Sequence, residues 1–146
     1  MRRPLGDGFE LDDDPGRVDL DAVVAFLRTT YWASGRPEEA IVASIRGSHR
    51  VVGLYRDGRQ AGFARVVSDG QTVAYLADVY VLPEHRGRGL GRVLAEEAVE
   101  GAGLGHVKWM LHTRDAHGLY VAMGFGPGGE RFMERPPAGG WGDEPG

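Results

Sequence analysis

Apolar residues along the chain follow two periods, one typical of strands and one typical of helices. Runs rich in β-branched and aromatic residues predict strands, and helical spacing between them predicts amphipathic helices. Asp-Gly turns at 57–58 and 69–70 separate three neighbouring strands, so these should form an antiparallel meander. The predicted strands are 9–11, 51–55, 60–67, 73–82, 106–112 and 130–133.

Four helices fall between these strands. Asp19 should cap a helix carrying Leu20, Val23, Val24 and Leu27, and Pro37 suits the first turn of a second helix. A third begins near Gly89 and repeats its apolar residues at 90, 93, 94 and 98. A short fourth helix after Thr113 or Asp115 should close at Gly124, and Phe125 should fold back near Tyr120.

The order of these elements, β-α-α-β-β-β-α-β-α-β, predicts an α/β (α+β) fold with a mixed central sheet of about six or seven strands. The strand at 106–112 follows a helix, so it should lie parallel to the strand that ends at Leu82. A chain of 146 residues suits one domain. The glycine- and proline-rich stretch 136–146 has no periodicity and is expected to be a loose C-terminal tail.

Composition narrows the classes of function. The net charge of −4 provides no general basic surface for nucleic acid, although it mildly favours a cationic small molecule. The chain has no cysteine, so disulfides, cysteine nucleophiles and thiolate metal sites are excluded. Its five histidines lack metal-ligand spacing with a carboxylate, and no metal is expected. No apolar run approaches the length of a membrane span, so a cytoplasmic location without membrane contact is expected.

A glycine-rich turn joins the strand ending at Leu82 to the third helix. Glycines at alternate positions keep side chains away from the first turn of the helix, where backbone N–H groups have no intrahelical partner. Nearby arginines add mobile positive charge, which suits a pyrophosphate. An ordinary solvated turn is the alternative. The turn reads Arg86, Gly87, Arg88, Gly89, Leu90, Gly91.

Two segments carry a resemblance to a known family. The turn at 86–91, preceded by the Val-x-Pro strand end at 81–83, resembles the Gln/Arg-x-x-Gly-x-Gly/Ala signature of the GNAT superfamily of acyl-CoA-dependent N-acyltransferases. The second segment, 113–125, is similar to that family's Asn-x-x-Ala-x-x-Leu-Tyr-x-x-x-Gly-Phe run, except that Thr113 replaces the asparagine. The resemblance covers roughly residues 9–133 and implies a GNAT-type fold.

The resemblance implies acetyl-CoA as the acyl donor. Its diphosphate would bind at 86–91, and its pantetheine arm would bind the backbone of Val79, Tyr80 and Val81, where the strand splays from its neighbour in this family. Thr113 could offer a hydroxyl to the same arm.

Two residues are candidates for proton transfer. Tyr120 stands where the family has its usual general acid, and a phenol with a pKa of about 10 can give a proton to a thiolate. Packing beneath Phe125 is its structural alternative. Asp78 lies among apolar neighbours, so it needs a partner or a purpose. It could act as a base for the incoming ammonium, directly or through water, or it could be a structural carboxylate held by loop amides or an arginine.

The loop between the first two helices holds Tyr31, Trp32 and Arg36. These residues could cover an edge of the core or line the acceptor site, as the equivalent segment commonly does in the GNAT family. The resemblance therefore implies an N-acetyltransferase that acts on a primary amine, as a monomer or a homodimer, by direct attack in a ternary complex. A catalytically silent acyl-CoA-binding module is the alternative.

Overall fold

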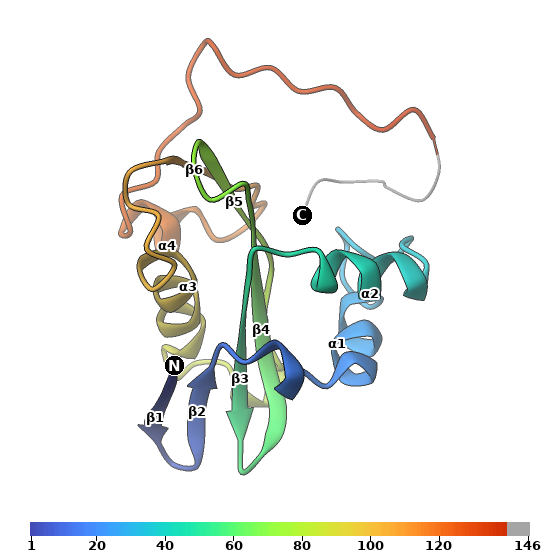
Figure 1. Ribbon diagram of the computed structural model, residues 1–146, viewed down its shortest axis with the longest axis vertical. Helices are drawn as coiled ribbons and strands as arrows, with labels where there is room; N and C mark the ends of the chain where they lie inside the picture. Colours follow the sequence, from blue (N-terminus) through green and yellow to red (C-terminus); the bar gives the residue numbers. More distant parts are fainter. Residues whose placement is uncertain (140–146) are drawn as a thin grey trace.

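The computed structural model describes residues 1–139 and consists of one six-stranded sheet with helices on both faces (Figure 1). Residues 140–146, part of the predicted tail, lie outside the described residues. The strands run in spatial order β1-β2-β3-β4-β5-β6. The elements are β1 (Arg2–Gly6), β2 (Phe9–Asp12), η1 (Pro15–Arg17), α1 (Leu20–Leu27), α2 (Glu38–Arg46), β3 (Arg50–Arg56), β4 (Arg59–Ser68), β5 (Val73–Val81), η2 (Pro83–His85), α3 (Leu90–Glu100), β6 (Lys108–Met110) and α4 (His117–Val121).

The sheet is antiparallel from β1 to β5, and only β6 runs parallel to its neighbour. Both the meander β3-β4-β5 and the parallel last strand confirm the predictions. The pairing of β5 with β6 is short, because it joins only Val73–Tyr75 to Lys108–Met110. Beyond Tyr75 the two strands are not paired, although β5 continues to Val81.

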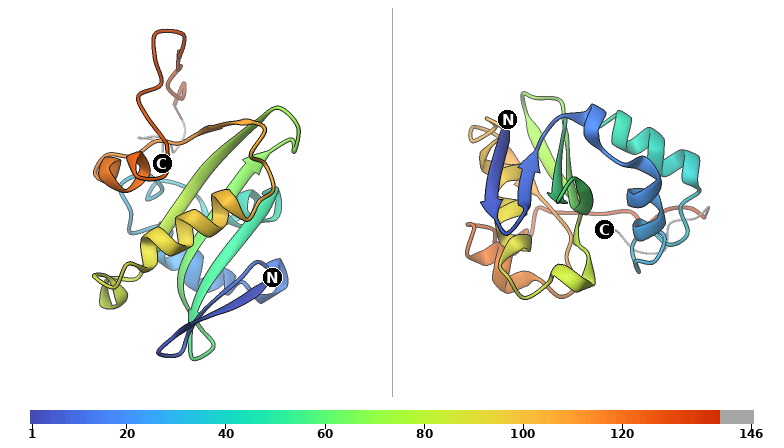
Figure 2. Two further views of the ribbon diagram at one scale, coloured as in Figure 1. Left: turned by 90° about the vertical axis from the view of Figure 1, so that its left-hand side faces the viewer. Right: turned by 90° about the horizontal axis from the view of Figure 1, so that it is seen from below.

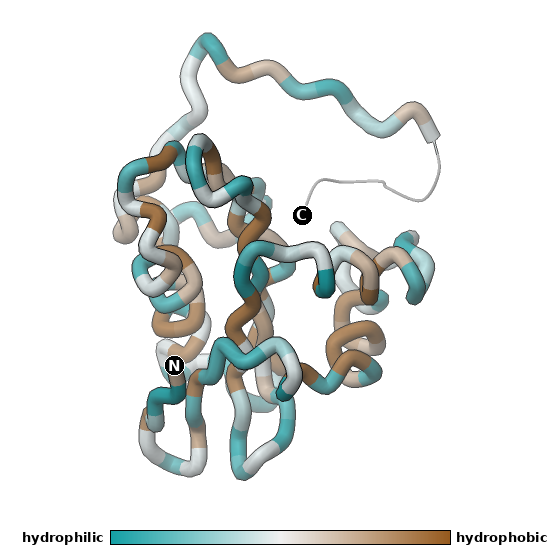
Figure 3. Tube along the Cα trace, in the orientation of Figure 1, coloured by the Kyte–Doolittle hydropathy of each residue, from teal (hydrophilic) through white to brown (hydrophobic). Residues whose placement is uncertain are grey.

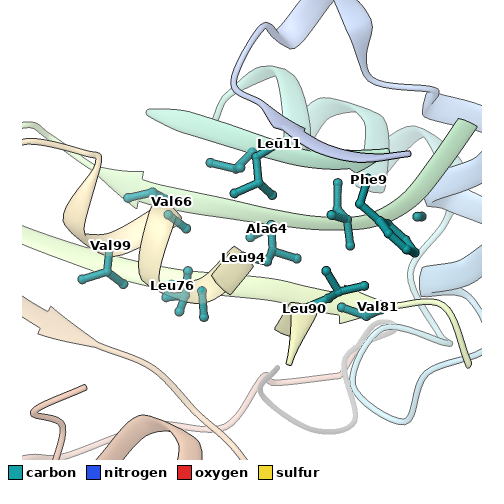
Figure 4. Close-up of a cluster of buried hydrophobic side chains, with 14 of the residues drawn as sticks. Phe9, Leu11, Ala64, Val66, Leu76, Val81, Leu90, Leu94 and Val99 are labelled. Atoms are coloured by element: carbon teal, nitrogen blue, oxygen red, sulfur yellow. The ribbon is translucent and has the colours of Figure 1, made fainter. Parts of the chain in front are cut away.

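Two apolar cores lie on opposite faces of the sheet. Helix α3 crosses one face, and α1 and α2 cover the other (Figure 2). Figure 4 shows the α3 core, where Leu90, Leu94 and Val99 meet strand residues such as Val66 and Leu76. The hydropathy colouring follows this division, with apolar segments along α1 and the central strands and polar segments at the turns (Figure 3).

Local sequence explains where the helices begin. The Asp19 carboxylate accepts a hydrogen bond from the amide of Ala22 and caps α1, as predicted. Pro37 is the residue that precedes α2, and its extended backbone directs the chain into the helix. Gly89 precedes α3 in the left-handed conformation. The hydroxyl of Thr113 accepts from the amide of Ala116 at 3.0 Å, one turn before α4.

The predicted fold class is confirmed, but the order of elements differs at both ends. Strand β1 was not predicted, because the run Arg2–Gly6 contains Pro4 and has no alternation of buried and exposed residues. The predicted closing strand at 130–133 is wrong. Glycines precede this run, none of its four residues lies in a strand, and its two apolar residues, Phe132 and Met133, are 47% and 90% exposed. Within residues 1–139, the outer edge of β6 has no strand beside it.

The C-terminal part of the α4 segment follows the prediction. Gly124 adopts a φ of 95°, and the amide of Phe125 donates to the carbonyl of Tyr120 at 3.0 Å. The rings of Phe125 and Tyr120 then meet edge to face, with 5.9 Å between their centroids. Among the described helices, none has the length and apolarity needed to cross a membrane.

Candidate active site

The glycine turn before α3 leaves open space in front of the helix. Gly87 and Gly89 have φ values of 82° and 75°, which disfavour residues with a side chain. A Cβ atom built on either glycine would meet no other atom within 4 Å. Both glycines therefore meet a backbone requirement, and neither is filled in by other protein groups.

Backbone N–H groups of the same turn have no acceptor. The amides of residues 87–92 donate no hydrogen bond within the part of the chain that the structure describes. They lie at the start of α3, where the helix dipole is positive. Leu90 contributes only its backbone here, because its side chain is buried in the core. Uncovered donors, positive potential and free space fit the diphosphate of a coenzyme A derivative.

The arginines of this turn differ in their contacts. The Nε atom of Arg86 donates to the carbonyl of Val81 at 3.0 Å, which ties the turn to the end of β5. Arg92 pairs with Glu96 at 2.6 Å on the exposed side of α3. The guanidinium of Arg88 lies 5.6 Å from the ring centre of Phe9. The side chains of Arg88 and Arg92 are themselves exposed, so both can move toward a bound anion.

The end of β5 has one free edge. Tyr80 and Val81 pair with β4, whereas no strand lies on the opposite side of residues 76–81 within residues 1–139. Of the predicted pantetheine-binding residues, Val81 already accepts from Arg86, and the ring of Tyr80 is buried against Phe26 at a centroid distance of 4.1 Å. The free backbone edge of Val79 and Tyr80 is therefore open to a ligand, whereas the Val81 carbonyl is already in use. This edge leads directly into the glycine turn.

A bulge in β5 turns Asp78 toward α1 and α2. The register with β4 shifts between Phe63 and Arg65, and Asp78 has a φ of 55°. The extra residue reverses which face the even-numbered residues of β5 occupy. Ala74 and Leu76 before the bulge pack in the α3 core, whereas Asp78 and Tyr80 point to the α1/α2 face and Val79 packs against the α3 core. Positive φ at a non-glycine residue costs energy, so the contacts of Asp78 must compensate for it.

Three side chains donate to the Asp78 carboxylate, which is fully buried. Trp32 Nε1 donates at 2.9 Å, Arg36 Nη1 donates to both oxygens at 3.0 Å, and Arg65 Nε donates at 2.7 Å. Burial is the largest influence on the pKa of Asp78 and raises it, but the charges of Arg65 and Arg36 and the hydrogen bonds outweigh burial. The pKa therefore lies below its ordinary value, and Asp78 is ionised at neutral pH.

Tyr31 connects this cluster to the segment before α4. Its ring meets that of Trp32 edge to face, with centroids 5.0 Å apart, and the guanidinium of Arg114 lies 3.6 Å from the Tyr31 ring centre. All three residues predicted for the acceptor site, Tyr31, Trp32 and Arg36, therefore gather around Asp78.

Tyr120 on α4 is mostly withdrawn from water. Burial is the main reason that the pKa of Tyr120 rises to about 12, and the nearby Asp115 and Tyr31 raise it further. Tyr120 therefore stays protonated at neutral pH.

Three residues near this site were not singled out from the sequence. Arg65 donates to Asp78, and Arg114 lies over the ring of Tyr31. His112 is the third, with its Nδ1 atom 2.5 Å from the Tyr75 hydroxyl and its Nε2 atom 3.1 Å from the Glu134 carboxylate. One signal was available for Arg65. It is a lone charge in the apolar run 60–67, adjacent in the meander to the strand that carries the lone charge of Asp78.

A cavity of about 1190 Å³ opens on the other side of β6, between that strand, α4 and the stretch 124–133. Thr113 and Tyr120 reach its wall, but no residue of β5 or of the glycine turn lines it. Three residues of the wrongly predicted closing strand, Arg131, Phe132 and Met133, line this cavity. Within residues 1–139, no group of three or more histidine, aspartate or glutamate side chains could hold a metal ion.

The turn, the free strand edge and the partly buried Tyr120 lie in the arrangement that the resemblance to the GNAT superfamily implies. A family model described as "Acetyltransferase (GNAT) family" matches residues 20–125, and the chain belongs to this family.

Named relatives agree with this class. Acetyltransferase FG08082 of Gibberella zeae is 34% identical over 64% of this chain, and streptothricin acetyltransferase of Streptomyces lavendulae is 34% identical over 82% of it. The matches span 65% and 64% of those relatives, so the chain covers just under two thirds of their length.

Solved structures show the same fold. A GNAT-family protein of Xanthomonas campestris pv. campestris has a TM-score of 0.83 and 37% identity, covering 92% of this chain and 95% of that one. Aminoglycoside N-acetyltransferase AAC(6')-Iy, solved in complex with CoA, has a TM-score of 0.68 and 19% identity, covering 91% of this chain and 97% of that one. At that identity, the second likeness concerns the fold alone.

Proposed function

We propose that this chain transfers an acetyl group from acetyl-CoA to the primary amine of a small-molecule acceptor, by direct attack within a ternary complex. The observation that carries the proposal is the uncovered turn at 87–92, whose amides have no acceptor within residues 1–139 and whose glycines leave space before them. The free edge of β5, which includes Asp78, lies directly before this turn in the chain.

Different segments of the chain would bind different parts of acetyl-CoA. Residues 86–91 would hold the diphosphate, and the backbone of Val79, Tyr80 and Val81, together with the Thr113 hydroxyl, would hold the pantetheine arm. When bound, acetyl-CoA supplies the thioester whose acetyl group passes to the amine. Backbone donors along the free edge of β5 suit the carbonyl oxygen of that group, because they are already oriented and need no reorganisation.

Tyr120 would act as the general acid. Its raised pKa keeps a proton on the hydroxyl oxygen at neutral pH, and that proton can pass to the leaving sulfur. The tyrosinate that remains regains its proton from solvent after the products leave.

Asp78 would hold the acceptor loop in place. A carboxylate that accepts from two arginines and a tryptophan, with a lowered pKa, is a weak base for an ammonium group. The geometry therefore favours the structural alternative for Asp78, in which it positions Trp32 and Arg36 beside the acceptor. The amine would lose its proton to water.

A free-thiol release assay with acetyl-CoA and a panel of primary amines tests the proposal. We expect Tyr120→Phe to lower kcat by roughly 100-fold, the usual size of a lost general acid, and to leave the Kd of acetyl-CoA unchanged. Phe125→Leu is a matched control, because it changes the packing around the Tyr120 ring and keeps the hydroxyl.

The alternative function gives a different result. A catalytically silent acyl-CoA-binding module would be stabilised against heating by acetyl-CoA and would release no thiol with any amine. That outcome, or an unchanged kcat in Tyr120→Phe, would contradict the proposed enzyme.

A further inference from the structure

The buried carboxylate of Asp78 does not balance the positive charge around it. Within residues 1–139, Arg36 and Arg65 both pair with this single carboxylate, so one positive charge of the pair remains uncompensated there. Their side chains are only 16% and 12% exposed, so water screens that charge less than at the protein surface. Arg114 adds a third guanidinium over Tyr31, in the same loop cluster.

Several N–H groups of these arginines remain available. Arg36 uses Nη1 for Asp78, and Arg65 uses Nε. Their other guanidinium nitrogens donate no hydrogen bond within residues 1–139, and none of them is a fully buried atom without a partner. These donors therefore face space that solvent, and hence a ligand, can reach. Asp78 fixes the orientation of both planar groups before any ligand binds.

We propose that the acceptor carries an oxyanion, of the carboxylate or phosphonate kind, in addition to its amine, and that Arg36 and Arg65 bind this oxyanion. The inference rests on the proposed acetyltransfer and assigns the class of its acceptor. Charge-assisted hydrogen bonds from guanidinium groups to such oxyanions are among the strongest in proteins.

The position of the arginines relates this site to the reacting centre. Trp32 joins Asp78 to Tyr31, and Arg114, in the segment that leads into α4 and Tyr120, lies over the Tyr31 ring. An acceptor bound through its oxyanion at Arg36 and Arg65 would therefore have its amine on the Tyr120 side of the same loop. An amino acid or an aminoalkylphosphonate carries both an amine and an oxyanion on one small molecule.

The positive charge of the arginine cluster is opposite in sign to the net charge of the chain. A net charge of −4 attracts cations at long range, but the arginine cluster would repel an acceptor that carries several positive charges. Polycationic amines, including streptothricin, the compound in the name of one relative, should therefore be poor ligands of this chain.

Binding of matched ligand pairs tests the inference directly. NMR titration of the full chain, saturated with coenzyme A, would compare amino acids with their carboxamides and with their decarboxylated amines. An aminoalkylphosphonate and spermidine complete the set. We expect the amino acid, the phosphonate or both to bind at least about tenfold more tightly than the carboxamide, as for one charge-assisted hydrogen bond. Equal or tighter binding of the carboxamides or of spermidine would overturn the inference.

Variants locate the binding to the cluster. The quantity to compare is the Kd of the carboxamide divided by the Kd of the matching amino acid. In Arg36→Gln and Arg65→Gln this ratio should fall toward one, whereas Arg46→Gln on the exposed side of α2 should leave it unchanged. Partial unfolding does not change this ratio, because both ligands titrate the same folded fraction. If Arg36→Gln and Arg65→Gln do not fold, Arg114→Gln, which breaks no ion pair within residues 1–139, should lower the ratio to a smaller extent. A ratio unchanged in every folded variant of the cluster would overturn the assignment.

This result is separable from the proposed function. Thiol release with spermidine or with carboxamides, and not with amino acids or phosphonates, would leave acetyltransfer intact and remove the oxyanion site. Preferential binding of oxyanions without thiol release would support the site and contradict the enzyme.

Discussion

The two faces of the sheet offer different kinds of chemical group to a ligand. On the α3 face, the glycine turn offers backbone N–H groups that have no acceptor in the described part of the chain, next to the free edge of β5. On the α1/α2 face, Asp78, Arg36 and Arg65 offer side-chain charges that are already joined in a network. A backbone site of this kind needs glycines at fixed positions, whereas a side-chain site needs the tertiary fold to bring its members together. The first should therefore tolerate most changes in distant residues, and the second should depend on every member.

The largest expected effect breaks the backbone site. Gly89→Glu places a carboxylate in the space before α3, where the phosphates would lie, and we expect acetyl-CoA affinity to fall by more than about 100-fold, measured by calorimetry. Gly103→Glu is the matched control, since Gly103 has a φ of 70° and open space around it but follows the opposite end of α3. An equal loss of affinity in both variants would point to backbone strain instead of charge.

A change of similar size breaks the side-chain site. Asp78→Asn removes the charge that holds Arg36 and Arg65, and we expect the free energy of unfolding to fall by about 3 kcal/mol. Acetyl-CoA affinity should change little, because the glycine turn lies outside this network. Urea denaturation at pH 7 measures the first quantity, and calorimetry measures the second. A loss of affinity as large as the loss in Gly89→Glu would show that the two faces are not independent.

The pH dependence of the same variant sharpens this test. The pKa of Asp78 is lowered in the folded chain, so its ion pairs stabilise the fold fully above the unfolded value of about 3.9, and this contribution is lost as the pH falls through the folded value. The stability difference between wild type and Asp78→Asn should be constant from about pH 5 to pH 8 and shrink below about pH 4. A constant difference down to pH 2 would mean that the Asp78 charge contributes nothing to stability.

The comparison also explains what the sequence could and could not predict. The glycines of 87–91 and the strand before them are contiguous in the sequence, so a phosphate-binding turn could be predicted there before the fold was known. The α1/α2 cluster is not contiguous, because Asp78 receives hydrogen bonds from residues 13, 42 and 46 positions away. The lone charge of Asp78 showed that a partner was needed, but only the bulge in β5 decides which one. The wrong prediction of a closing strand at 130–133 has the same cause, because two apolar residues at 132–133 do not specify a strand with which to pair.

The smallest expected effect concerns mobile charge beside the backbone site. Glu96→Gln breaks the exposed pair with Arg92, whose side chains are 41% and 54% exposed. The free energy of unfolding should therefore change by less than about 0.5 kcal/mol. Arg92 is then free to approach the phosphates, and we expect acetyl-CoA to bind about twofold more tightly at low salt and equally at 1 M salt.

Glu100→Gln separates this effect from a general change in charge. Glu100 is an exposed acid in the last turn of the same helix, so its substitution alters the net charge equally but releases no arginine near the turn. Affinity should be unchanged in Glu100→Gln if Arg92 is the cause. Equal tightening in both variants would instead assign the effect to the long-range electrostatic field of the protein. The arginines of the α3 face would then act at a distance and without a fixed orientation, unlike Arg36 and Arg65 on the α1/α2 face, which Asp78 holds in place.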